Sequence, residues 1–179
     1  MSSISRVGRR RCGVFRRCLW SGLAFLAGLG GSVEAKTLVV RPQGPVTSVR
    51  EAIRQAEPGD TIRIEAGVYM GNLRLEKPLA LEGVGSPRIL GEGSGSVITV
   101  LADGCVIRGL VIERSGRALV EEDSGILVKS NRNRIEENEI RDVLYGIYLY
   151  AAHDNLIRGN RIRGRTELEF GERGNGCLL

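Results

Sequence analysis

Few residues of this sequence could do acid–base chemistry, and they are scattered along the chain. The sole histidine, His153, precedes Asp154 in the stretch YAAHDN. An imidazole beside a carboxylate can act as a general base, which a lyase or epimerase acting on acidic sugars would need. Glycosidic cleavage would instead need two positioned carboxylates, and acidic runs occur at 121–123 and 136–137. Such runs are more often solvated faces, and a lone His-Asp pair is more often structural, so we expect no catalytic residues.

Metal-binding side chains are equally sparse. Copper favours imidazole, thiolate and thioether ligands, and beyond residue 35 these are His153, Cys105, Cys177 and Met70. Their spacing matches no metal motif, and the two cysteines form no C-x-x-C pair of the kind that indicates zinc. His153 and Cys177 are therefore weak candidate ligands, whereas Cys105 is expected in the core.

Residues 1–35 have the three parts of a signal peptide. Six arginines lie in the first 17 positions, an apolar run of about 11 residues follows, and Val33 and Ala35 are the small residues expected before a signal-peptidase cut. A membrane-spanning helix needs about 18 or more apolar residues. We therefore expect cleavage after Ala35, no transmembrane anchor in the mature chain, and a periplasmic location. General secretion is favoured over twin-arginine export because neither arginine pair lies in a good consensus.

Cleavage after Ala35 changes what the charge of the chain implies. The formal net charge of +5 comes from 26 basic and 21 acidic residues, but the leader contains six of the basic residues and only one acidic residue, Glu34. The mature chain is therefore close to neutral. Nucleic-acid binding depends on a basic surface, so we expect no nucleic-acid partner.

A repeat of about 22 residues runs through the mature chain. The stretch NRIEENEI at 133–140 returns as NLIRGNRI at 155–162, and GILV at 125–128 returns as GIYL at 146–149. An earlier copy, CVIRGLVI at 105–112, precedes the first motif by 28 residues, because of a polar insertion between the two copies. A fixed period of this size indicates a repeat architecture, and each unit is read as two short strands.

Apolar residues alternate within each unit, which is strand periodicity. The units are too short to hold a strand, a helix and their loops, so burying one face of every strand requires a coil whose equivalent strands stack in parallel sheets. The sequence therefore predicts an all-β fold, a parallel β-helix of four or five units between residue 61 and the C-terminus.

The asparagines of the repeat are expected to be structural. Asn tolerates left-handed backbone geometry and hydrogen-bonds to local backbone, and stacked Asn side chains can bond to one another. We expect Asn133, Asn138, Asn155 and Asn160 to mark the corners of successive coils.

Before the repeats, the segment at 48–59 predicts a short helix. Ser48 and Glu51 have the spacing of a capping box, apolar residues follow the stripe of an amphipathic helix, and Pro58-Gly59 ends it. We predict three parts: a signal peptide at 1–35, a strand and capping helix at 36–60, and β-helix coils at 61–179. The ending RGNGCLL looks like the start of another strand, so we expect these coils to be incomplete at the C-terminus.

Three longer stretches belong with those quoted above: SVREAIRQAEPGDTIRIEAGVYMGNLRLEKPLALEGVG from residue 48, ADGCVIRGLVIERSG from residue 102 and ERGNG from residue 172. Together, these stretches resemble the NosD family of periplasmic maturation proteins of nitrous oxide reductase. The resemblance implies a right-handed parallel β-helix that works with an ABC-type transporter, made of an ATPase and a membrane subunit. The implied task is assembly of the copper–sulfide centre of nitrous oxide reductase, with copper a possible ligand.

Two other functions fit the same fold. Secreted polysaccharide lyases and epimerases share the PGDTIRIEAGVY and asparagine–isoleucine patterns, and His153-Asp154 would be their candidate base. A carbohydrate-binding module could use Tyr145, Tyr148 and Tyr150 as a platform for sugar rings. The expected function is that of a non-enzymatic assembly factor.

Overall fold

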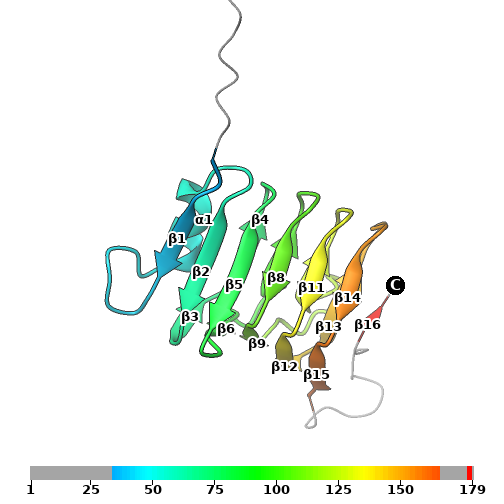
Figure 1. Ribbon diagram of the computed structural model, residues 1–179. Helices are drawn as coiled ribbons and strands as arrows, with labels where there is room; N and C mark the ends of the chain where they lie inside the picture. The colour runs from blue at the N-terminus through cyan, green and yellow to red at the C-terminus, as the bar shows by residue number, and fades with distance from the viewer. Residues whose placement is uncertain (1–33, 166–176, 179) are drawn as a thin grey trace, which may run out of the picture. The chain divides into compact units, whose positions relative to one another are not determined.

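The computed structural model describes residues 34–165 and 177–178, and within them the chain is a parallel β-helix with one short helix (Figure 1). The predicted all-β class is confirmed. The elements are β1 (Thr37–Val40), α1 (Val49–Gln55), β2 (Thr61–Glu65), β3 (Val68–Met70), β4 (Leu73–Leu75), β5 (Ala80–Val84), β6 (Arg88–Leu90), β7 (Ile98–Val100), β8 (Val106–Arg108), β9 (Val111–Glu113), β10 (Ser124–Val128), β11 (Arg134–Glu136), β12 (Glu139–Val143), β13 (Tyr145–Leu149), β14 (Leu156–Arg158), β15 (Arg161–Gly164) and β16 (Cys177–Leu178).

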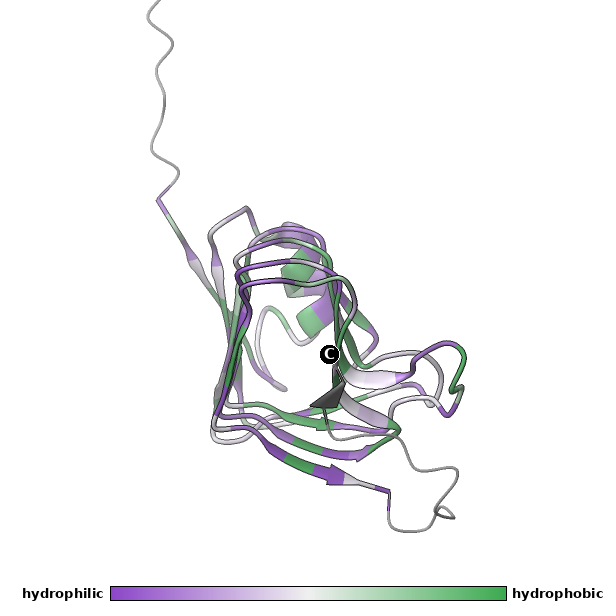
Figure 2. Cartoon of the chain, turned by 90° about the vertical axis from the view of Figure 1, so that its right-hand side faces the viewer, coloured by the Kyte–Doolittle hydropathy of each residue, from purple (hydrophilic) through white to green (hydrophobic). Residues whose placement is uncertain are grey.

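The strands form three parallel sheets that the chain visits in turn. Sheet A has the order β1-β2-β5-β8-β11-β14, sheet B the order β15-β12-β9-β6-β3, and sheet C the order β16-β13-β10-β7-β4. Figure 2 shows the coils superimposed, with strands on three sides. The pairing repeats the spacing seen in the sequence: Ile135 lies opposite Ile157, 22 residues on, and opposite Ile107, 28 residues back.

Apolar residues from all three sheets fill the inside of the coil in rows along its axis. On sheet A the row is Ile62, Leu81, Ile107 and Ile135, all at most 1% exposed. Parallel strands buried on one face only need alternating side chains, which is the pattern in the repeat. Each coil therefore contributes one layer to a continuous core.

Each coil has three strands, so the two-strand reading of the repeat was wrong. NRIEENEI contains both β11 and β12, because Glu137 adopts a left-handed conformation with φ of 55° and turns the chain from sheet A to sheet B. At the same corner one coil earlier the residue is Gly109, with φ of 69°. A glutamate at such a position gives no sign of a corner in the sequence, since a residue with positive φ is usually Gly or Asn.

Helix α1 covers the first coil, as predicted, and packs against β1, β2 and β4. Val49, Ala52 and Ile53 are its buried face. The Ser48 side chain accepts a hydrogen bond from the backbone N–H of Glu51 at 3.4 Å. The Glu51 carboxylate bonds to Arg54 and Gln55 instead of returning to Ser48, so the cap is a simple N-cap and only half of a capping box.

The long coil of the repeat carries its extra residues in one loop, between β9 and β10. This loop, 114–123, leaves sheet B and enters sheet C, and it stands out at one side in Figure 2. Of the described residues, no helix has both the length and the apolar character to cross a membrane.

Candidate functional site

The first asparagine stack lies where sheet C turns into sheet A. Asn133 is 1% exposed. Its Oδ1 accepts the backbone N–H of Cys105 in the coil before (2.8 Å), and its own backbone N–H donates to Oδ1 of Asn155 in the coil after (2.9 Å). The Asn133 Nδ2 donates to the same Asn155 oxygen at 2.9 Å. The side chain thus joins three coils by satisfying backbone groups that the turn leaves without sheet partners.

The second stack lies where sheet A turns into sheet B. Asn138, 2% exposed, accepts the backbone N–H of Leu110 at 3.1 Å and donates to the carbonyl of Ile107 at 2.9 Å. Asn160 accepts the Asn138 backbone N–H at 3.0 Å and donates to the Ile135 carbonyl at 2.7 Å. All of these partners lie within the chain, so the four asparagines are engaged in holding corners.

Charged residues of alternating sign form a row on the outer face of sheet A. Successive strands place Arg63, Glu82, Arg108, Glu136 and Arg158 side by side. The Arg108–Glu82 pair lies at 2.8 Å and the Arg158–Glu136 pair at 3.2 Å. The sequence contains this row in its 22- and 28-residue offsets, but from the sequence only Glu136 was considered, as part of a solvated acidic run, and the row was not identified. Each carboxylate lies between two cations, and the row of three arginines and two glutamates has a net charge of +1.

A second charge cluster lies on the outer face of sheet B. The Glu113 side chain, 8% exposed, accepts from Arg88 at 2.7 Å and also pairs with Arg141. Burial alone would raise the pKa of this carboxyl, but hydrogen bonds and charge from the two arginines outweigh it and hold the pKa below its ordinary value. Glu113 is therefore ionised at neutral pH, and it ties β6, β9 and β12 together.

The candidate catalytic pair lies in an exposed turn after β13. His153 makes intramolecular hydrogen bonds through its backbone. Its N–H donates to Asn131 Oδ1 at 2.8 Å, and its carbonyl accepts from the Arg132 N–H at 3.1 Å. Asp154 takes a left-handed conformation with φ of 56°. The acidic runs do not join this pair, because Glu122 accepts from the Tyr148 hydroxyl and Glu136 is held by arginines.

The donor set of the described residues does not fit a copper site. Cys105 is fully buried, and its thiol donates to the carbonyls of Lys77 and Ala102. Burial raises the pKa of this thiol, which disfavours the thiolate that binds copper. Cys177 pairs with Ile147 through its backbone, and its side chain lies outside the described part. Across residues 34–165, no three His, Cys, Asp or Glu side chains gather around one point.

The three tyrosines of the possible sugar platform lie outside the core, on β13 and immediately after it. The rings of Tyr145 and Tyr148 stack with centroids 5.9 Å apart, and the Tyr148 hydroxyl donates to Glu122 at 2.7 Å. Tyr150 is half exposed, with the Lys129 ammonium 5.0 Å from its ring centroid. Each of the three tyrosines therefore already has an intramolecular partner, either on one face of its ring or at its hydroxyl, where a sugar would bind.

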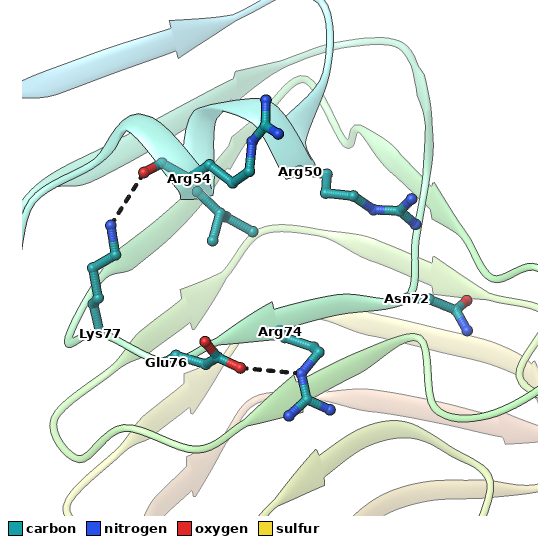
Figure 3. Close-up of a pocket in the computed structure, with 7 residues that line it drawn as sticks. Arg50, Arg54, Asn72, Arg74, Glu76 and Lys77 are labelled. Carbon is teal, nitrogen blue, oxygen red and sulfur yellow. Dashed lines mark hydrogen bonds and ion pairs between the residues drawn. The ribbon is translucent and has the colours of Figure 1, made fainter.

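A cavity of about 430 Å³ lies between α1 and β4 (Figure 3). Its basic side chains are used within the protein: Arg50 donates to the Gly71 carbonyl at 2.7 Å, Arg74 pairs with Glu76 at 3.3 Å, and Lys77 donates to the last carbonyls of the helix. In Figure 3 the labelled guanidinium groups point to different places and do not converge. The cavity therefore lies at the interface between helix α1 and the first coil, and its side chains attach the helix to that coil. The seven lining residues are Arg50, Ile53, Arg54, Asn72, Arg74, Glu76 and Lys77.

Comparison with known proteins identifies relatives of this β-helix. Residues 84–172 match the family model described as "Periplasmic copper-binding protein (NosD)". A protein of Pseudomonas aeruginosa named "Probable ABC transporter binding protein NosD" is 30% identical over 140 residues, which cover 72% of this chain and 33% of the relative. A protein of the same name in Stutzerimonas stutzeri is 28% identical over 119 residues, covering 65% of this chain and 27% of the relative.

Among solved structures, an alginate lyase from Paenibacillus sp. str. FPU-7 has a TM-score of 0.58 and 23% identity, covering 71% of this chain and 44% of the lyase. At that identity the likeness concerns the fold. The chain spans about a third of the length of the curated relatives it matches.

Proposed function

Since the chain belongs to the NosD family, we propose that it is a periplasmic accessory factor that helps mature the copper–sulfide centre of nitrous oxide reductase. The observation that carries this proposal is the family match, which begins at the end of β5 and includes every strand from β6 to β15. An ABC-type transporter, with ATPase and membrane subunits, is the proposed partner, because the curated relatives are named as ABC transporter binding proteins.

The described residues support a rigid scaffold acting without catalysis. The asparagine stacks and the Glu113 cluster fix the coils relative to one another, while His153 contributes its backbone to a turn. A scaffold of this kind would act through its outer faces, by positioning two proteins next to each other. No step of the proposed role passes through a copper ion held by the described residues, because their donor set does not fit one.

The test is deletion of the full-length gene in the organism that encodes it. Nitrous oxide reductase purified from the deletion strain should lack the absorption of its copper–sulfide centre and should not reduce nitrous oxide. The wild-type gene should restore both, whereas a gene without codons 2–35 should not, because the product would remain in the cytoplasm. A fully loaded reductase in the deletion strain would refute the proposal.

An assay on acidic polysaccharide tests the non-enzymatic part separately. The exported protein is incubated with alginate and with pectate, and the products are followed by absorbance of unsaturated uronates and by proton NMR of the epimer ratio. We expect neither to change. A product that disappears with His153→Ala would instead make this protein an enzyme.

A further inference from the structure

The backbone N–H of Lys36 donates a hydrogen bond to a buried carboxylate. Its nitrogen donates to Oδ1 of Asp60 at 2.8 Å, and Asp60 is 2% exposed. The Lys36 carbonyl accepts from the Thr61 N–H at 2.8 Å, which begins the pairing of β1 with β2. The position of the Lys36 nitrogen is therefore fixed by sheet A on one side and by Asp60 on the other.

The Asp60 carboxylate also binds the segment that follows the capping helix α1. Its Oδ2 accepts the backbone N–H of Glu57 at 2.8 Å, in the turn that leaves α1. Hydrogen bonds from the Lys36 and Glu57 N–H groups lower the pKa of Asp60, with help from the charges of Lys36 and Lys77. Among the described residues, no cationic group hydrogen-bonds to the Asp60 carboxylate, although carboxylates with so little exposure are normally paired.

We propose that Asp60 is the receptor for the N-terminus created when the leader is cut after Ala35. A signal peptidase adds water across the Ala35–Lys36 peptide bond, which gives the Ala35 carboxylate and the Lys36 α-ammonium. The nitrogen that now donates to Asp60 as a neutral amide becomes the cation. The buried carboxylate then acquires its counter-charge without any movement of the chain.

The position of the cut decides whether this pair forms. A cut one residue later removes the Lys36 nitrogen, and a cut before Ala35 leaves an amide there and places the ammonium on an exposed residue. Hydrogen bonds between ionised partners are about twice as strong as neutral ones. Cleavage after Ala35 therefore strengthens the junction of β1, α1 and β2, and the capped fold is more stable once the leader is gone.

The first test compares two forms of the chain, one starting at Lys36 and one starting at Glu34, each with and without Asp60→Asn. Asp103→Asn is the matched control, since Asp103 also accepts a backbone N–H, that of Asn131 at 2.8 Å. Urea unfolding at pH 6 gives the equilibrium constant of unfolding. We expect Asp60→Asn to raise this constant about tenfold more in the chain starting at Lys36 than in the one starting at Glu34. Asp103→Asn should have the same effect in both.

The second test needs no variant to fold and reads the amine itself. The exported protein is sequenced from its N-terminus by mass spectrometry, and the rate of α-amine acetylation by acetic anhydride is followed against pH. Lys36 should be the first residue. Pairing with Asp60 should raise the pKa of the amine, so acetylation at pH 7 should be about tenfold slower than in a peptide with the same first residues.

Three results would overturn the proposal: a mature chain that begins elsewhere, an equal effect of Asp60→Asn in both chains, or an α-amine that reacts as fast as the peptide. None of these tests depends on nitrous oxide reductase, so their failure is separate from failure of the proposed function.

Discussion

Replacing Asn138 with alanine removes a side chain that serves three neighbours. The backbone N–H of Leu110 loses its acceptor, the carbonyl of Ile107 loses its donor, and Asn160 loses the side-chain contact at 3.0 Å. Leu110 and Ile107 are each 1% exposed, so water cannot easily replace the missing bonds. Two backbone polar groups are left buried without partners.

The loss of stability follows from those two groups. Leaving a buried donor or acceptor unsatisfied costs about 1–3 kcal/mol, so two of them should lower the free energy of unfolding by roughly 2–6 kcal/mol. With a urea m-value of about 2 kcal/mol/M, the midpoint of unfolding should fall by about 1–3 M. This would be a large share of the stability of a domain, typically about 5–15 kcal/mol.

The matched control is Asn131→Ala, at an exposed corner where the side chain accepts the His153 N–H at 2.8 Å. Water can replace this bond, so the expected loss is about 1 kcal/mol or less. Both variants and the wild type are unfolded in urea, with circular dichroism as the signal and the m-value checked for constancy. Equal midpoints for the two variants would refute the claim that Asn138 satisfies buried backbone.

Three other variants test neighbouring features. The pKa of Glu113 is lowered in the folded protein. The stabilising contribution of Glu113 is therefore present above the pKa that it has in the unfolded chain, and it is lost as pH falls through the pKa that it has in the folded state. Glu113→Gln should flatten the fall in Tm between about pH 5 and pH 3. Gly83→Ala should lower the urea midpoint by more than 1 M (roughly 2 kcal/mol at the same m-value), since a Cβ there would lie 2.1 Å from the Gly109 carbonyl oxygen; an unchanged midpoint contradicts this. In a Cys177→Ser chain starting at Lys36, Cys105 should react with Ellman's reagent only after urea is added, because it is buried with a raised pKa.

The fold could be predicted from the sequence because the apolar residues of the repeat mark the successive layers of the core. One isoleucine per strand, such as Ile135 and Ile157, gives both the register and the inward face. The number of strands per coil could not be read in the same way. A corner such as Glu137 depends on a backbone conformation that the Asn160 side chain of the next coil supports, through the Ile135 carbonyl and the Asn138 N–H.

Contacts between coils were harder to predict than contacts within the repeat. The charged row on sheet A needs the offset of 28 for Glu136 opposite Arg108 and of 22 for Glu136 opposite Arg158, and the two offsets differ because of the loop at 114–123. The contact between Lys36 and Asp60 joins a pre-repeat strand to a turn. No periodicity links those two positions, so only the folded chain brings them together.

Many polar groups on the regular parts of the coil are already paired within the chain. The asparagines are satisfied within the chain, and both glutamates of the sheet A row are paired with arginines. The loop at 114–123 breaks the repeat, and it exposes Leu119 and Val120 while the carboxylate of Asp123 and the guanidinium of Arg165 hold its base. At 95% exposure, Val120 is the most exposed large apolar side chain of the described residues. A search for partner contacts by mutation should therefore begin at this loop, before the flat faces of the sheets.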